Sequence, residues 1–174
     1  MKNNVVDIIK NFGCVHFGNT SKALSDLEEY HSYTVYGKLV DGRPHGFVWI
    51  THNIDFSSTY IPVRRHMAGL VYPDYRHNSD LEKETPILCC GVYYQEGSNI
   101  LPVGEPNPSL LIEHDTKDRI TFCGMQQDGL RHGLGSQFTY NKHGVSELQG
   151  IWITGILTYF MEDGRLIPLS STNK

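Results

Sequence analysis

The segment Gly37-Lys-Leu-Val-Asp-Gly-Arg-Pro-His-Gly46 returns 87 residues later as Gly124-Met-Gln-Gln-Asp-Gly-Leu-Arg-His-Gly133. Both copies have the pattern G-x-x-x-D-G-x-x-H-G, so five of the ten positions are identical. Each copy follows a run of β-prone residues, at 33–36 and 120–123. We therefore interpret the chain as a set of repeated hairpins, because self-similarity of this kind is typical of repeat architectures.

The Asp-Gly pair at the centre of each copy is the turn of the expected hairpin. Glycine adopts a positive φ at no steric cost, which makes Asp-Gly between β-prone runs a strong turn signal. In the first copy, strands are expected over 33–40 and 47–51. In the second copy, strands are expected over 119–124 and 135–140. The sequence predicts two hairpins of the same design.

Fainter units surround these two hairpins. A third unit runs over 148–160 with a turn at 162–165, and a fourth candidate covers 90–97. Between them lie two stretches, 72–86 and 97–109, which are rich in polar residues, glycine or proline. We interpret both as long loops, and long loops of this kind are often functional.

Only two segments have a helical pattern. In residues 3–12, apolar side chains recur at helical spacing and Gly13 supplies a stop. In residues 20–31, Thr20 or Ser21 can cap a helix with a short apolar stripe at Leu24 and Leu27. We therefore predict an N-terminal helical segment over 1–31 and a β-hairpin repeat domain over 32–174, together forming a single globular unit.

Composition narrows the class of protein. The 174 residues are 39% apolar and 20% charged with a net charge of −4, which indicates an ordered globular chain. The absence of a long basic run argues against a duplex-DNA-binding protein. No apolar stretch of 18 residues occurs, so no transmembrane helix is predicted. Cysteines stand at 14, 89, 90 and 123 without a C-x-x-C pair, so we expect reduced thiols in a cytoplasmic protein and no metal or other cofactor.

The second copy and its surroundings resemble a known repeat. From Phe122 the chain reads aromatic-x-Gly, then Asp128-Gly129, then His-Gly-x-Gly over 132–135, then an aromatic residue, and later Gly-x-Trp-x-x-Gly over 150–155. This resembles the MORN repeat, a hairpin of about two dozen residues, and the resemblance is clearest over 119–155. It implies a scaffold that binds proteins or membrane lipids and whose repeats supply no catalytic residue. On that reading, His45 and His132 are turn residues that hydrogen-bond neighbouring backbone.

The same two histidines support an alternative reading. If the two copies bring His45 and His132 to one face, the imidazoles can act as general acid and base on a phosphodiester without a metal. Neither residue stands in the H-x-[ST] pattern of two-histidine phosphodiesterases, because Gly-Phe and Gly-Leu follow them. The alternative function is a small metal-independent phosphodiesterase or nuclease acting on a nucleotide.

Basic side chains suggest where an anion would bind. Arg64-Arg65-His66 is the one compact basic triplet, and guanidinium groups bind phosphate and carboxylate bidentately. Lys38, Arg43 and Arg131 add positive charge near the two His-Gly segments. The other reading of the triplet is a solvated turn or a salt-bridged strand edge.

These observations combine into one expectation. We expect a mainly β protein of consecutive antiparallel hairpins, a MORN-like repeat sheet preceded by one or two short helices. We expect an interaction module that binds a protein or an anionic phospholipid headgroup, in the cytoplasm or peripheral to a membrane. An open repeat sheet leaves edge strands unpaired, so a homodimer formed through an edge strand is also expected.

Overall fold

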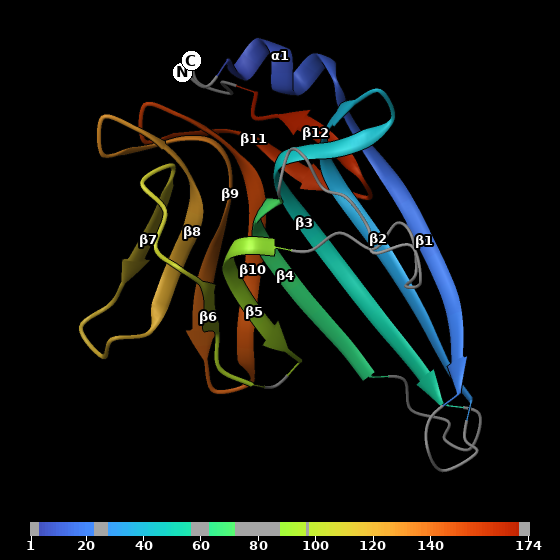
Figure 1. Cartoon of the computed structure of the whole chain (residues 1–174). Coiled ribbons are helices and arrows are strands. Elements are labelled where there is room, and N and C mark those ends of the chain that lie inside the picture. The colour runs from blue at the N-terminus through green and yellow to red at the C-terminus, as the bar shows by residue number, and fades with distance from the viewer. Residues whose placement is uncertain (1–3, 23–27, 57–62, 72–87, 97, 171–174) are drawn as a thin grey trace.

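The structure is a computed structural model that describes residues 4–22, 28–56, 63–71, 88–96 and 98–170. It consists of two six-stranded antiparallel sheets, each with its strands in chain order (Figure 1). Sheet A contains β1 (Phe12–Lys22), β2 (Glu28–Val40), β3 (Arg43–Phe56), β4 (Val63–Val71), β5 (Leu88–Gln95) and β6 (Leu101–Gly104). Sheet B contains β7 (Leu110–His114), β8 (Ile120–Gln127), β9 (Leu130–Asn141), β10 (Gly144–Ile153), β11 (Ile156–Glu162) and β12 (Arg165–Pro168). The prediction of a mainly β protein made of consecutive hairpins is confirmed.

The two copies of the repeated motif form the same turn. Asp41 and Gly42 join β2 to β3 with φ values of 52° and 75°, and Asp128 and Gly129 join β8 to β9 with φ values of 54° and 80°. Two consecutive left-handed residues form the turn whose twist matches that of the flanking strands. Aspartate tolerates this conformation and glycine favours it, which explains the residue pair.

The His-Gly pair that ends each copy forms a bulge. In β2–β3 the pairing shifts between Leu39 and Gly37, so Lys38 faces three residues of β3, 45–47. In β8–β9 the pairing shifts between Gln126 and Gly124, so one residue of β8 faces 132–134. The glycine of each pair has a positive φ, 86° at position 46 and 108° at position 133. Both hairpins therefore carry the same bulge, and the motif encodes a turn followed by a bulge.

The correspondence between the sheets extends beyond these hairpins. A register shift between Leu70 and Val71 interrupts the β4–β5 pairing, and one between Ile151 and Trp152 interrupts the β10–β11 pairing. The first shift lies opposite Gly46 and Phe47 of β3. The second lies opposite Gly133 and Leu134 of β9, which are 87 residues further along the chain. The register shifts thus correspond across four strands of each sheet, β2–β5 in sheet A and β8–β11 in sheet B. This agreement supports the inference of repeated hairpins more strongly than the ten-residue motif alone.

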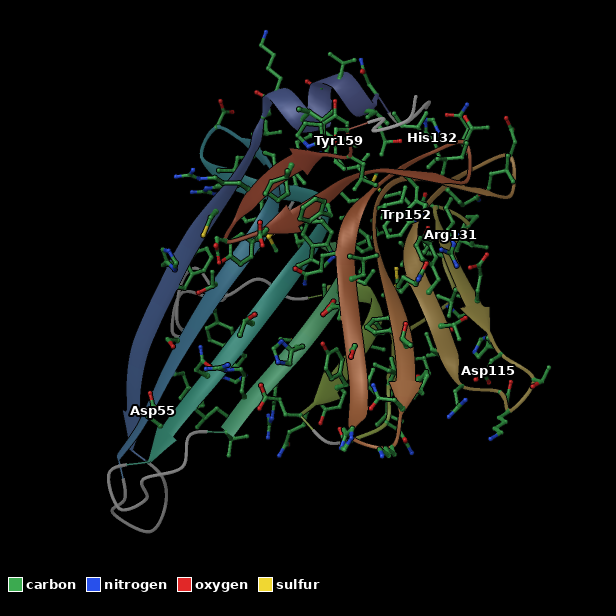
Figure 2. All side chains as sticks on the ribbon, turned by 180° about the vertical axis from the view of Figure 1, so that it is seen from behind. Asp55, Asp115, Arg131, His132, Trp152 and Tyr159 are labelled. Atoms are coloured by element: carbon green, nitrogen blue, oxygen red, sulfur yellow. The ribbon has the colours of Figure 1, made fainter. Side chains whose placement is uncertain are left out.

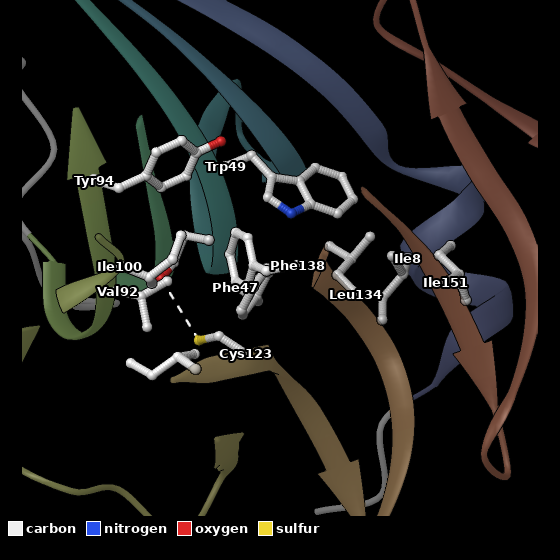
Figure 3. Close-up of a cluster of buried hydrophobic side chains, with 12 residues drawn as sticks. Ile8, Phe47, Trp49, Val92, Tyr94, Ile100, Cys123, Leu134, Phe138 and Ile151 are labelled. Atoms are coloured by element: carbon white, nitrogen blue, oxygen red, sulfur yellow. Dashed lines mark hydrogen bonds between the residues drawn. The ribbon is translucent and has the colours of Figure 1, made fainter. Parts of the chain in front are cut away.

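The two sheets pack face to face around one hydrophobic core. The side chains drawn in Figure 3 come from both sheets and from α1 (Val5–Lys10), whose Ile8 is buried among them. Figure 2 shows that the ends of β2 and β3, around Asp55, diverge from sheet B, so this part of sheet A has no sheet packed on it. The buried members of the core are Ile8, Phe47, Trp49, Ala68, Val92, Tyr94, Ile100, Ile120, Cys123, Leu134, Phe138 and Ile151.

The helix expected over 3–12 is confirmed as α1, with Asn4 as its N-cap. The helix expected over 20–31 is wrong. Residues 20–22 belong to β1 and residues 28–31 to β2, while 23–27 lie outside the described residues. The ladder from Phe12↔Lys38 to Lys22↔Glu28 is continuous, so cross-strand pairing prevails over a weak apolar stripe. The boundary expected between residues 31 and 32 falls inside β2.

The loop expected over 97–109 contains β6, so that prediction is wrong for residues 101–104. Pro102 pairs with Val92 at the edge of sheet A, where a residue without an N–H is tolerated. The loop expected over 72–86 lies outside the described residues. Among the described residues, no helix has the length and apolar character needed to cross a bilayer.

Candidate functional site

The basic triplet is divided between the two faces of β4. Successive side chains of a strand point to opposite faces, so Arg64 and His66 share one face and Arg65 takes the other. On the face toward sheet B, Arg64 Nη1 lies 3.7 Å and His66 Nε2 3.6 Å from Glu96 Oε1. The His66 ring also stacks on the core residue Tyr94, with centroids 4.9 Å apart. The triplet therefore does not act as one anion clamp.

Arg65 belongs to a different group of side chains, on the face of sheet A turned away from sheet B. In the pairing register Arg65 faces His52, and His52 faces Tyr33 on β2. Residues opposite each other in neighbouring strands project to the same side, so these three side chains form a row across the sheet. A small apolar cluster built around Val35, Val48, Ile50 and Val71 lies on the same face.

His31 joins this row through a direct contact with His52. Its Nδ1 lies 3.0 Å from Nε2 of His52, and the two rings stack with centroids 5.2 Å apart. The Tyr33 ring also stacks on His52, with centroids 4.1 Å apart. A hydrogen bond between two ring nitrogens requires one donor and one acceptor, so the imidazoles share a single proton at this contact. We call Tyr33, His31, His52 and Arg65 the Arg65 site.

The protonation of His52 follows from its surroundings. The side chain is 7% exposed, and burial lowers the pKa of His52 from 6.5 to about 4, with further lowering by His31 and Arg65. Burial disfavours the charged imidazolium, and a neighbouring guanidinium disfavours it further. His52 is therefore neutral at pH 7, and the fixed positive charge of the site belongs to Arg65.

The decisive observation concerns the Nε atom of Arg65. This N–H is buried and has no hydrogen-bond partner, and among the described residues no carboxylate forms an ion pair with the guanidinium. A buried unpaired donor costs about 1–3 kcal/mol, and more when the group is charged. Native proteins rarely retain such a group without a use for it. An oxyanion bound to Arg65 would satisfy the donor and the charge together.

The two histidines of the repeated motif lie in different sheets. His45 lies half-buried in the bulge of β3, and no interaction among the described residues links it to His132. His132 Nδ1 accepts a hydrogen bond of 3.1 Å from the backbone N of Thr154.

The other basic residues are dispersed. Lys38 forms an ion pair with Asp7 of α1, and Arg43 is exposed at the start of β3. Arg65 faces a residue nine positions along β3 from Arg43, which is roughly 30 Å away at about 3.3 Å per residue. Lys38 and Arg43 therefore do not contribute to the Arg65 site.

Arg131 has a set of internal partners on sheet B. Its Nε donates to Glu113 Oε2 at 2.9 Å and its Nη1 to Gln137 Oε1 at 2.8 Å. Its guanidinium lies over the Phe122 ring, 4.1 Å from the centroid. Trp152 meets that ring edge-on, and Figure 2 shows Arg131 and Trp152 on the same part of the sheet. These contacts hold Arg131 in place as a cover over the two buried aromatic rings.

Sequence reasoning missed three of the four members of the Arg65 site. The sequence predicts His31 at the end of a helix and gives no signal of a site at Tyr33 or His52. A hairpin drawn from the Asp41-Gly42 turn alone pairs Tyr33 with Ile50, because the bulge that moves the partner to His52 is not included. Among the described residues, no three His, Cys, Asp or Glu side chains are grouped so as to hold a metal ion.

Comparison of the chain with protein-family models, with curated proteins and with solved structures finds no match in any of the three.

Proposed function

We propose that this chain is an interaction module built on a MORN-like repeat scaffold, and that it binds an oxyanion group of its partner at the Arg65 site. The observation that carries the proposal is the buried, unpaired Nε of Arg65. Arginine presents its donors in a planar fork that matches phosphate and carboxylate oxygens. A bound oxyanion would offset the cost of leaving this donor without a partner.

The other members of the site, Tyr33, His31 and His52, form a group of aromatic rings next to Arg65 in the pairing register. The ligand class we favour is the phosphate of an anionic phospholipid headgroup, with a phosphorylated or carboxylate-bearing protein segment as the other outcome of the test.

Binding fits the geometry better than phosphodiester hydrolysis. An acid and a base must flank the substrate, whereas the His31 and His52 rings touch each other directly. The nitrogen Nδ1 of His132 already accepts from backbone. Hydrolysis by His45 and His132 remains the alternative proposal, and it predicts that the wild-type chain turns over cyclic or linear dinucleotides and that His132→Ala does not.

The experiment compares two methionine substitutions on adjacent residues. Arg65→Met keeps the length of the side chain and removes the guanidinium, and Arg64→Met does the same on the opposite face of β4. Sedimentation is measured with phosphatidylcholine vesicles that do or do not contain a phosphoinositide. We expect the wild type and Arg64→Met to bind only the phosphoinositide vesicles, and Arg65→Met to lose most of that binding. Equal loss in both variants, or no retention of the wild type by vesicles or by a protein pull-down panel, would overturn the proposal.

We also propose that two chains associate through an edge strand. The edges of the two sheets are β1, β6, β7 and β12. Of these, β1 is the longest, with 11 residues. Strand β6 is less suited to pairing, because Pro102 has no backbone N–H to donate to another strand. Light scattering over a range of concentrations tests the idea, since a constant monomer mass would rule it out.

A further inference from the structure

A cysteine, a histidine and a threonine meet on the edge of sheet A, on the face opposite the Arg65 site. Cys14 and His16 are two positions apart on β1, so both project to the same side. The distance from Cys14 Sγ to His16 Nε2 is 3.6 Å. His16 Nδ1 lies 3.1 Å from Oγ1 of Thr34, the residue that pairs with His16 on β2. The order thiol, imidazole, hydroxyl is that of an activated nucleophile, its base and the group that orients the base.

We propose that Cys14 is the reactive thiol of this chain, with His16 as its base and Thr34 as the residue that positions the imidazole. The site reacts with a small-molecule disulfide and forms a mixed disulfide with it. Thiol–disulfide exchange requires a thiolate and access to its sulfur. It requires no hole for an oxyanion and no metal. The side chains of Cys14 and His16 project from the face of β1, where Cys14 is half-buried and His16 is exposed.

The resting state of Cys14 determines what His16 has to do. Burial raises the pKa of the Cys14 thiol, and a hydrogen bond with Tyr36 acts more weakly in the opposite direction. The resting form is therefore the thiol, and the thiolate has to be produced during attack. The ionisable groups around Cys14 are His16 and Tyr36 of its own sheet, and Asp163 in the β11–β12 turn acts on Tyr36. His16 is the imidazole among them, and its Nε2 lies 3.6 Å from the Cys14 sulfur, so it is the group placed to act as the base.

The exchange balances without any further reactant. When Nδ1–H of His16 donates to Thr34 Oγ1, Nε2 has a free lone pair and accepts the proton of the Cys14 thiol. The Cys14 sulfur then attacks one sulfur of the disulfide, and the disulfide bond breaks as the new S–S bond forms. The departing thiolate takes the proton from the imidazolium. Cys14 is oxidised, and the released thiol is the reduced product.

The other three cysteines lack this arrangement. Cys90 and Cys123 are 4% and 0% exposed, and burial raises their pKa values to about 11 and about 12. Cys89 is half-buried, and its sulfur lies 3.8 Å from that of Cys90. Inert buried thiols are the usual state of cysteine in a core. Cys89 is the best internal control, because it is half-buried like Cys14 and no imidazole contacts it among the described residues.

The test uses the full chain and oxidised glutathione as the probe. Mass spectrometry of proteolytic fragments follows the mixed disulfide at each cysteine between pH 6 and pH 9. We expect Cys14 to react roughly 100-fold or more faster than Cys89 near pH 7, the lower end of the gain that a positioned general base supplies. His16→Gln is expected to remove this advantage and to shift the pH profile of Cys14 upward to that of an unassisted thiol. His45→Gln, which alters an imidazole elsewhere in the same sheet, is expected to change nothing.

Substitutions of Thr34 test whether its hydroxyl positions the His16 imidazole or only supports the fold. Thr34→Val keeps the β-branched shape suited to a strand and removes the hydroxyl, so it is expected to slow Cys14 less than His16→Gln does while leaving the circular dichroism unchanged. Thr34→Ser restores the hydroxyl and is expected to restore the rate. Equal rates at Cys14 and Cys89 in the wild type, or an unchanged Cys14 profile in His16→Gln, would overturn the proposal.

Discussion

Trp49 Nε1 donates a hydrogen bond of 2.8 Å to Ser136 Oγ, and these two residues occupy corresponding positions of the two structural copies, 87 residues apart. The hydroxyl of Ser136 donates in turn to Glu147 Oε2 at 2.8 Å, and Tyr94 donates to Glu147 Oε1 at the same distance. The Glu147 carboxylate therefore accepts hydrogen bonds from both sheets. The duplicated halves are joined by a polar network as well as by apolar packing.

Removing the hydroxyl of Ser136 leaves the buried indole N–H of Trp49 without its acceptor. We expect Ser136→Ala to lower the free energy of unfolding by about 1–3 kcal/mol, the usual cost of an unsatisfied buried group. Urea unfolding measures this loss. Ser146→Ala, at an exposed position of β10, is the control and is expected to stay within about 0.5 kcal/mol of the wild type. Additive effects of Ser136→Ala and Trp49→Phe would contradict the contact, because coupled residues are non-additive.

The depressed pKa of His52 predicts how stability depends on pH. As the pH falls below 6.5, the unfolded chain takes up a proton at His52, whereas the native chain remains neutral there until about pH 4. The native state is therefore fully stable with respect to this group above pH 6.5 and loses stability between pH 6.5 and pH 4. The loss is about 2 kcal/mol after allowance for partial solvent screening. Urea unfolding at pH 7.5, 5.5 and 4.5 should show a smaller decline in His52→Gln, while His143→Gln, at an exposed site, should follow the wild type.

Arg65 should destabilise the native state when no ligand is bound. Arg65→Met removes a buried donor that has no partner and keeps the aliphatic stem in place. We expect this variant to be more stable than the wild type by about 1 kcal/mol in the absence of anions, since the unpaired donor no longer has to be desolvated. Thermal unfolding in buffer free of phosphate and sulfate measures the difference. A clear loss of stability would show that Arg65 has a structural role, and would weaken the binding proposal.

Arg131 should behave in the opposite way. Arg131→Met loses the bonds to Glu113 and Gln137 and the contact over the Phe122 ring. We expect unfolding to become easier by about 1–3 kcal/mol, because hydrogen bonds to charged groups are among the stronger ones. Vesicle binding through the Arg65 site should be unchanged. Arg43→Met, at an exposed position, is the matched control, and an equal loss there would indicate a general charge effect.

The sequence predicts the parts of this fold that local chemistry determines. Asp-Gly requires a left-handed turn wherever it occurs, so both central hairpins and their strands could be located from residues alone. The histidine of the His-Gly pair was recognised, but its role in a bulge was not, because a bulge depends on which residues the partner strand offers. That single omission displaces the expected register by two residues and hides the contact between Tyr33 and His52.

Long-range pairing explains the other errors. Nothing within residues 20–31 shows that part of this segment pairs with β1, so an apolar stripe suggested a helix. The division of Arg64-Arg65-His66 between two faces follows from strand alternation, but no strand over 63–71 is predicted from the sequence. The orphaned Nε of Arg65 has no sequence signal, since it depends on which groups the fold leaves nearby.

Two glycines leave space for the Phe122 ring on the outer face of sheet B. A Cβ added at Gly135 would lie 2.6 Å from the tip of Phe122, and one added at Gly124 would lie 2.7 Å from it, so the ring occupies a slot that only glycines leave open. Phe122→Ala should cost about 3–5 kcal/mol and leave a hollow with the outline of a benzene molecule beneath the Arg131 guanidinium. A small aromatic hydrocarbon in this hollow would restore the contact between a ring and the guanidinium. Benzene should then raise the melting temperature of Phe122→Ala and leave that of the wild type unchanged, which would turn a folding element into a designed chemical switch.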